Sequence, residues 1–260
     1  MVEMNCPYYL VGVSAIALKI DQIGIKPPRG TKDIDFAVMI SSMDEYNEIV
    51  KILIRKGFTK TESTWTLYHN NYDVAIDILP FGEIEQKQKI NFTDRQVELH
   101  FLGFREVLEN PDYLQIADKT VAIPPFPGMV LLKLISWNDR PEIRKDDLSD
   151  ILRVIEHYYA LSEDEILSAH FDTFIDAPEF DKWLISAEVL GRKSGVYLLK
   201  SDLLRNRIFE IIDRNLSDTK QSPLLISWAL QKNWEINYAV LLLKALFRGM
   251  KHTLENSGEK

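Results

Sequence analysis

The chain has 260 residues, of which 46% are hydrophobic and 27% are charged, and its formal net charge is −8. This length allows one large or two small domains whose core needs neither disulfides nor a structural metal. Collagen, a coiled coil, a disordered tail and a membrane span are excluded, because the chain has no matching repeat and no uninterrupted apolar stretch of about 18 residues.

The single cysteine, Cys6, excludes an intramolecular disulfide and a multi-cysteine zinc site. It fits a reducing compartment, and the first residues lack the basic start and apolar run of a secretory signal. We therefore expect a cytoplasmic protein with no membrane partner.

The first 123 residues alternate between strand and helix patterns. The helix predicted at 43–56 has apolar residues at Tyr46, Ile49, Val50 and Leu53, and Gly57 follows it where a C-terminal glycine is expected. A second helix is predicted at 14–23, and strands are predicted at 8–12, 33–40, 65–69, 72–79, 96–102 and 120–123, with a tight turn at 70–71.

Three prolines at 124, 125 and 127 separate this part from an almost wholly helical remainder. Helices are predicted at 128–138, 141–159, 162–170, 180–190, 201–215, 223–231 and 237–255. We expect an α+β fold in which residues 1–125 form a mixed β-sheet domain with flanking helices and residues 126–260 form an all-helical domain.

Two strands carry carboxylates in the middle of apolar patterns. Asp33 and Asp35 alternate along one strand, so they share a face, and Asp77 lies within the later β-rich run at 72–79. Neighbouring carboxylates repel each other unless a cation lies between them, and Mg²⁺ prefers such oxygen ligands together with substrate phosphates. If the two strands were adjacent, the three aspartates would suit a two-metal phosphoryl-transfer site.

Gly12 and Ser14 lie between the first strand and the first helix. Backbone N–H groups at a helix N-terminus bind anions, and a glycine lets a phosphate approach closely. The same two residues are also compatible with an ordinary turn glycine and a helix-capping serine.

In this order, Gly12-Val-Ser14, Asp33-Ile-Asp35 and Asp77 resemble the DNA polymerase β-like nucleotidyltransferase superfamily. The chain is more closely similar to bacterial predicted nucleotidyltransferases related to abortive-infection (AbiEii-type) toxins. That similarity lies in residues 29–36, 77–82, 132–140 and 145–150, and it covers roughly residues 8–160.

The resemblance implies a nucleotidyltransferase-type sheet and a Mg²⁺-dependent transfer of a nucleoside monophosphate (NMP) from a nucleoside triphosphate (NTP), with release of pyrophosphate. It implies that Asp33 and Asp35 bind Mg²⁺, two ions being expected. Asp77 would complete the metal site or accept the proton of the attacking hydroxyl.

The resemblance also implies the phosphate-binding residues. Gly12 and Ser14 would cradle the phosphates, and Lys133 would neutralise the triphosphate. Apart from the resemblance, we expect Arg29 and Arg140 to add local positive charge. The family's usual second glycine or serine is Val13 here, which gives one hydroxyl contact fewer.

The helix predicted at 128–138 adds an independent observation. Lys133 and Trp137 are four residues apart and share a helix face, with Arg140 close to it at the helix end. Trp137 could stack on a base or belong to the core. For Asp147 and Asp150, three residues apart, we expect ion pairs that tie the helical part to the sheet rather than catalysis.

The acceptor is left open as an RNA end, a protein side chain or a small molecule. Residues 192–260 carry twelve Lys and Arg against seven Asp and Glu, which keeps RNA open but does not establish it. Two alternatives remain: a catalytically degenerate protein that binds a nucleotide or a partner, and an aminoglycoside-type small-molecule nucleotidyltransferase with an acidic acceptor pocket at 172–181. The resemblance to toxins also implies a cognate antitoxin-like partner.

Overall fold

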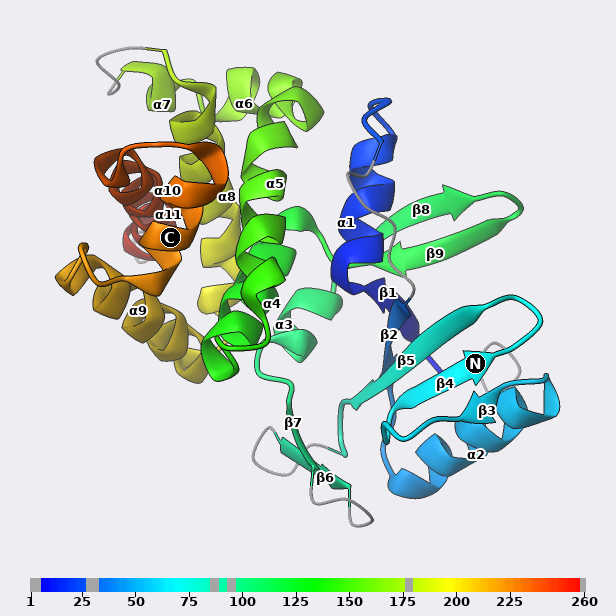
Figure 1. Cartoon of the computed structure of the whole chain (residues 1–260). Helices are drawn as coiled ribbons and strands as arrows, with labels where there is room; N and C mark the ends of the chain where they lie inside the picture. Colours follow the sequence, from blue (N-terminus) through cyan, green and yellow to red (C-terminus); the bar gives the residue numbers. More distant parts are fainter. Residues whose placement is uncertain (1–5, 27–32, 85–88, 93–96, 176–179, 258–260) are drawn as a thin grey trace. The chain divides into compact units, whose positions relative to one another are not determined.

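The computed structural model describes residues 6–26, 33–84, 89–92, 97–175 and 180–257. The chain divides into two compact units, Met1–Pro125 and Phe126–Lys260. The first combines a mixed sheet with helices and the second is helical (Figure 1). The predicted α+β class is confirmed.

The first unit is built on a seven-stranded sheet with the order β3-β4-β5-β2-β1-β9-β8 (Figure 1). The central pair β2 and β5 is parallel, as is β1 with β9, and the other pairs are antiparallel. The strands are β1 (Tyr8–Val11), β2 (Asp33–Met39), β3 (Thr59–Lys60), β4 (Thr66–His69), β5 (Val74–Phe81), β8 (Asp112–Ile116) and β9 (Lys119–Ile123), and β6 (Lys89–Phe92) pairs with β7 (Val97–His100) in a separate hairpin.

The described residues of this unit also form three helices: α1 (Gly12–Asp21), α2 (Met43–Arg55) and α3 (Phe104–Leu108). The start of α2 follows from its sequence, because the Ser42 side chain accepts a hydrogen bond from the Glu45 N–H and acidic residues occupy the first turn. Tyr46, Ile49 and Val50 are the buried residues of α2, which confirms the apolar face that the sequence predicts.

The described residues of the second unit form helices joined by short turns. They are α4 (Phe126–Asp139), α5 (Lys145–Leu161), α6 (Glu163–Ala169), α7 (Asp172–Ile175), α8 (Lys182–Leu198), α9 (Asp202–Ser217), α10 (Pro223–Lys232) and α11 (Ile236–Asn256). Side chains cap three of their N-termini: Asp181 for α8, Ser201 for α9 and Ser222 for α10.

Glycines allow α8 and α11 to pack at very close range. A Cβ on Gly191 would lie 2.0 Å from the Leu246 carbonyl oxygen, and a Cβ on Gly249 would lie 2.0 Å from the Glu188 carbonyl oxygen. The two backbones are therefore in direct contact at this crossing, which a larger residue at either glycine would push apart.

The start of α5 differs from the prediction. We expected this helix to begin at Pro141, but residues 141–143 form a turn in which the Arg144 N–H bonds to the Arg140 carbonyl, and the helix begins at Lys145. Within the part of the chain that the structure describes, no helix combines the length and the apolar character that crossing a membrane requires.

Candidate functional site

A row of side chains crosses the centre of the sheet at one level. Asp35 on β2 is the register partner of Val11 on β1 and of Asp77 on β5, and Asp77 is in turn the partner of Thr66 on β4. Register partners point to the same face of a sheet. Asp35 and Asp77 therefore lie side by side, because β2 and β5 are the adjacent strands that a shared site needs. Both side chains are half-buried.

Gly12 adjoins this row from the start of α1. Its φ is +69°, and a Cβ at this position would lie 2.0 Å from Oδ2 of Asp35. The backbone that begins α1 therefore packs directly against the Asp35 carboxylate. Only a glycine fits there, because an L side chain is strained at this φ and would overlap the carboxylate.

Asp77 is held from the other side of the row. The Thr66 hydroxyl donates a 2.6 Å hydrogen bond to Asp77 Oδ1. Tyr46, on α2, is buried at 4% exposure, and burial together with the negative charge of Asp77 raises its pKa. Tyr46 therefore stays neutral, and its hydroxyl donates to the Thr64 carbonyl at 3.4 Å.

Asp33 lies one step along the same face, at the exposed end of β2. Its register partner on β5 is Ala75, whose own partner on β4 is Tyr68. The Tyr68 hydroxyl donates to Asp73, which anchors the end of the β4–β5 hairpin.

The phosphate-binding residues predicted in the first unit are only partly described. Helix α1 begins at Gly12, and no side chain forms a capping hydrogen bond at its N-terminus within the described residues. Ser14 therefore lies inside the first turn, half-buried, and does not cap the helix. The N-terminus of α1 presents backbone N–H groups beside Asp35, an arrangement that suits an anion. Arg29 lies outside the described residues.

The aspartates supply the oxygen ligands that Mg²⁺ prefers. Asp35 and Asp77 are adjacent on a rigid central strand pair, and Asp33 shares their face. Residues 6–26, 33–84 and the later described ranges hold no ready-formed group of three or more His, Cys, Asp or Glu side chains at metal-binding distance. The donor chemistry fits a Mg²⁺ ion bound between Asp35 and Asp77, with substrate phosphates as further ligands.

Lys133 lies on α4 in the second unit and is bonded to two buried aspartates of α5. Its Nζ is 2.7 Å from Asp147 Oδ1 and 2.7 Å from Asp150 Oδ2. Burial alone would lower the pKa of Lys133, but the two carboxylates outweigh it and raise that pKa. The Arg144 Nε donates to Asp147 at 2.8 Å. These ion pairs join α4 to α5 within the second unit and balance the charge of Lys133, whereas we expected them to tie the helical part to the sheet.

The neighbouring residues of α4 have simpler roles. Trp137 is 3% exposed, so it belongs to the helical core. Arg140 follows α4 in the turn that leads to α5, and its backbone N–H bonds to the Trp137 carbonyl at 3.2 Å.

The carboxylates of the 172–181 stretch contribute to the packing of the second unit. Arg192 binds both oxygens of Asp172, at 2.9 and 2.6 Å. Asp181 caps α8 through the Trp183 and Leu184 N–H groups and accepts a 2.7 Å bond from the Tyr238 hydroxyl. Residues 176–179 lie outside the described part of the chain. Asp172 and Asp181 thus each hold a packing contact within the second unit, and the acidic acceptor pocket stays a prediction.

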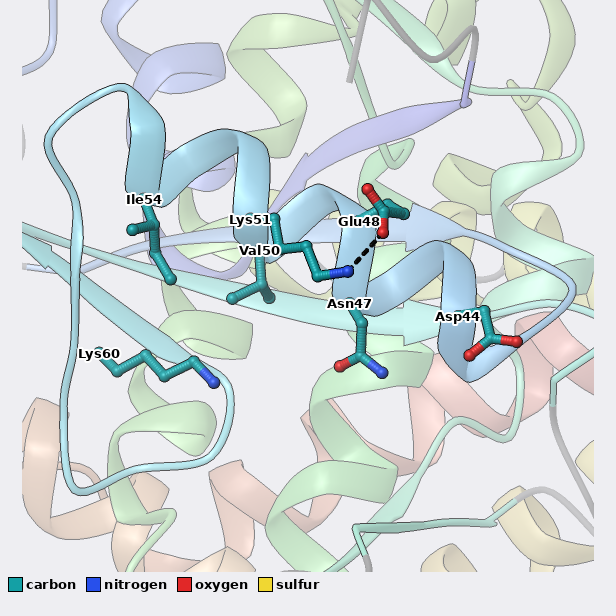
Figure 2. A pocket seen from close by; sticks show the side chains of 7 residues that line it. All are labelled: Asp44, Asn47, Glu48, Val50, Lys51, Ile54 and Lys60. Atoms are coloured by element: carbon teal, nitrogen blue, oxygen red, sulfur yellow. Dashed lines mark hydrogen bonds and ion pairs between the residues drawn. The ribbon is translucent and has the colours of Figure 1, made fainter.

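A surface hollow of about 310 Å³ lies along α2 and Lys60 (Figure 2). The lining includes the ion pair between Lys51 Nζ and Glu48 Oε1, which are 2.6 Å apart. Figure 2 marks this ion pair with a dashed line. The lining of the hollow includes none of the predicted site residues; it consists of Asp44, Asn47, Glu48, Val50, Lys51, Ile54 and Lys60.

No protein-family model matches the chain, and no curated protein matches it. Among solved structures, the chain is similar to the lincomycin-bound lincosamide antibiotic adenylyltransferase LnuA, with 16% identity, a TM-score of 0.37 and coverage of 58% of this chain and 87% of that one. It is also similar to the antibiotic-resistance factor ANT(2'')-Ia, with 16% identity, a TM-score of 0.37 and coverage of 67% and 86%. Similarity at this level does not establish an activity for this chain.

Proposed function

We propose that this protein is a Mg²⁺-dependent nucleotidyltransferase that moves an NMP from an NTP to an acceptor hydroxyl and releases pyrophosphate. The observation that carries the proposal is the direct pairing of Asp35 with Asp77 across β2 and β5, with the N-terminus of α1 packed against Asp35 through Gly12. Carboxylates beside a helix N-terminus place a cation-binding group and an anion-binding group within one small area. A metal–triphosphate complex needs both.

In the proposed reaction, the acceptor oxygen bonds to the α-phosphorus, and the bond from that phosphorus to the oxygen bridging to the β-phosphorus breaks. Asp33 and Asp35 would bind the Mg²⁺ that accompanies the triphosphate. The N–H groups of α1 and the Ser14 hydroxyl would orient the phosphates. Asp77 completes the metal site or takes the proton of the attacking hydroxyl. Bound Mg²⁺ would supply charge neutralisation for the attacking and leaving oxygens.

Two residues of the second unit enter the proposal: the family resemblance assigns the triphosphate charge to Lys133, and Arg140 would add local positive charge. Because Lys133 is already balanced by two aspartates, a phosphate role would require it to exchange these partners. Within the first unit, Arg29 and the N-terminus of α1 are the proposed source of positive charge at the triphosphate.

Metal-dependent nucleotide binding tests the proposal. Isothermal titration of each NTP should show binding that needs Mg²⁺ and is lost in Asp35→Asn, because amide substitution removes the ligand charge. Asp118→Asn is the matched control, since Asp118 lies in the exposed β8–β9 turn with its side chain 81% exposed. Nucleotide binding that ignores both Mg²⁺ and Asp35→Asn would favour the binding-only alternative.

The acceptor class is a separate question with a direct experiment. Purified protein, an α-labelled NTP, Mg²⁺ and total cell extract are incubated beside an Asp33→Ala control, and the products are separated into RNA, protein and small molecules. Asp33-dependent label in one fraction identifies the acceptor. Growth arrest that depends on Asp35 when the protein is expressed alone would support a toxin role with an antitoxin-like partner.

A further inference from the structure

In the proposed function, Asp77 either completes the metal site or accepts the proton of the attacking hydroxyl. A group that fixes its carboxylate would favour metal binding in one defined orientation. Thr66 is such a group. It lies on β4 directly opposite Asp77 on β5, and its Oγ1 donates to Asp77 Oδ1 at 2.6 Å.

We propose that Thr66 is a positioning residue, which holds the Asp77 carboxylate beside Asp35 in the orientation that binds a divalent cation. This proposal rests on the proposed function, because it assigns Thr66 a role at the same site.

The order of side chains across the sheet supports this role. Thr66, Asp77 and Asp35 occupy consecutive strands at one level, so Thr66 is on the side of Asp77 away from Asp35. A hydrogen bond from that side restrains rotation of the carboxylate about its Cβ–Cγ bond. Threonine is well suited, because its β-branched side chain has few rotamers in a strand and keeps the hydroxyl in place.

The surroundings of Asp77 add a second restraint. Tyr46 is buried and bonded to the Thr64 carbonyl, two residues before Thr66. The segment that carries Thr66 is thus tied to α2 as well as to β5. Removing a group that orients a metal-binding side chain typically lowers metal affinity or activity by about 10- to 100-fold.

Two substitutions at Thr66 separate the hydroxyl from the shape of the side chain. Thr66→Val keeps the branched shape and removes the donor, whereas Thr66→Ser keeps the donor. Thr120→Val is the matched control: Thr120 on β9 lies opposite Gln115 on β8 and donates to its Oε1 at 2.9 Å. It removes an equivalent cross-strand hydrogen bond of the same sheet without touching an aspartate.

The probe is Mn²⁺ together with an α,β-methylene NTP, with binding followed by electron paramagnetic resonance on the full chain. We expect Thr66→Val to bind Mn²⁺ about tenfold more weakly, and Thr66→Ser and Thr120→Val to stay within about twofold of the unaltered protein. In the transfer assay, Thr66→Val should need about tenfold more Mg²⁺ for half-maximal rate but approach the normal kcat at saturating Mg²⁺.

Unchanged Mn²⁺ affinity in Thr66→Val would overturn the role of Thr66 while leaving the proposed function standing. Equal weakening in Thr66→Val and Thr120→Val, or in Thr66→Val and Thr66→Ser, would also overturn it, because the effect would then not come from the hydroxyl on Asp77. If the unaltered protein binds no Mn²⁺ with any nucleotide, the proposed function itself fails, and the role of Thr66 fails with it.

Discussion

Replacing Gly12 with alanine tests how closely the start of α1 packs on Asp35. The residue has a φ of +69°, where an L side chain costs about 1–2 kcal/mol, partly offset by the smaller freedom of the unfolded chain, for a net loss of about 1 kcal/mol. The new Cβ would lie 2.0 Å from Asp35 Oδ2, whereas ordinary contact begins at 3.4 Å, so the carboxylate must retreat by about 1.4 Å.

A shift of this size should affect chemistry far more than folding. Displacing a reacting or ligating group by about 1 Å costs about 100-fold in rate, so we expect Gly12→Ala to fold but to lose about 100-fold in transfer rate, with weaker Mn²⁺ binding. Urea unfolding measures the free energy of unfolding, and the labelled-NTP assay measures the rate.

Gly24→Ala is the matched control for this experiment. Gly24 also has a left-handed backbone, with φ +75°, but a Cβ there would meet no atom of the described residues within 4 Å. It should therefore show the backbone cost of about 1 kcal/mol with no loss of metal binding or transfer. Equal effects of the two substitutions on Mn²⁺ affinity would refute the inferred contact between Gly12 and Asp35.

Three further predictions concern the helical unit. Lys133→Met leaves two buried carboxylates without their shared cation and should lower the free energy of unfolding by about 3–5 kcal/mol; a urea midpoint that does not move would contradict this. Gly249→Ala places a Cβ 2.0 Å from the Glu188 carbonyl oxygen and should cost about 1–3 kcal/mol by overpacking, so an unchanged thermal midpoint would argue against the close α8–α11 crossing. Burial lowers the pKa of His157, so the unfolded chain binds its proton more readily. The contribution of His157 to the free energy of unfolding is therefore fully present above about pH 6.5. It is lost as the pH falls through the lower pKa of the folded state. His157→Gln should show a shallower loss of stability between about pH 6.5 and 5, and an identical pH profile would exclude this contribution.

The sequence predicted the aspartates on their strands but not the register that joins them to Thr66. A two-residue turn at 70–71 would place Thr66 opposite Ala75. The hairpin instead has a longer loop in which Asp73 adopts φ 50°, and Thr66 pairs with Asp77. Aspartate tolerates this conformation through its short polar side chain. A change of two residues in loop length moves every cross-strand partner, and composition alone does not reveal it.

The sequence also misplaced elements whose local signals are overridden by contacts elsewhere. We expected the helix that begins near 180 to end at 190, directly before Gly191. In the structure α8 continues to Leu198, since Gly191 is needed for contact with α11. Strand β8 was missed because its hairpin to β9 turns at Ala117, with φ 51°, and not at a glycine or asparagine.

Lys133 shows the same limit at the level of a single side chain. Its spacing with Trp137 and Arg140 indicated a shared helix face, but its partners Asp147 and Asp150 lie on the next helix. Local periodicity gives the direction of a side chain, whereas the identity of its partner depends on how two helices pack.

The position of the label in the NTP tests the central claim most directly. Two reactions are run with the accepting fraction, one with an NTP labelled at the α-phosphorus and one with the label at the γ-phosphorus, each beside Asp35→Asn. NMP transfer predicts that the α-label becomes attached to the acceptor and the γ-label is released in pyrophosphate, and that both depend on Asp35. Attachment of the γ-label to the acceptor, or attachment of the α-label that persists in Asp35→Asn, would contradict the account.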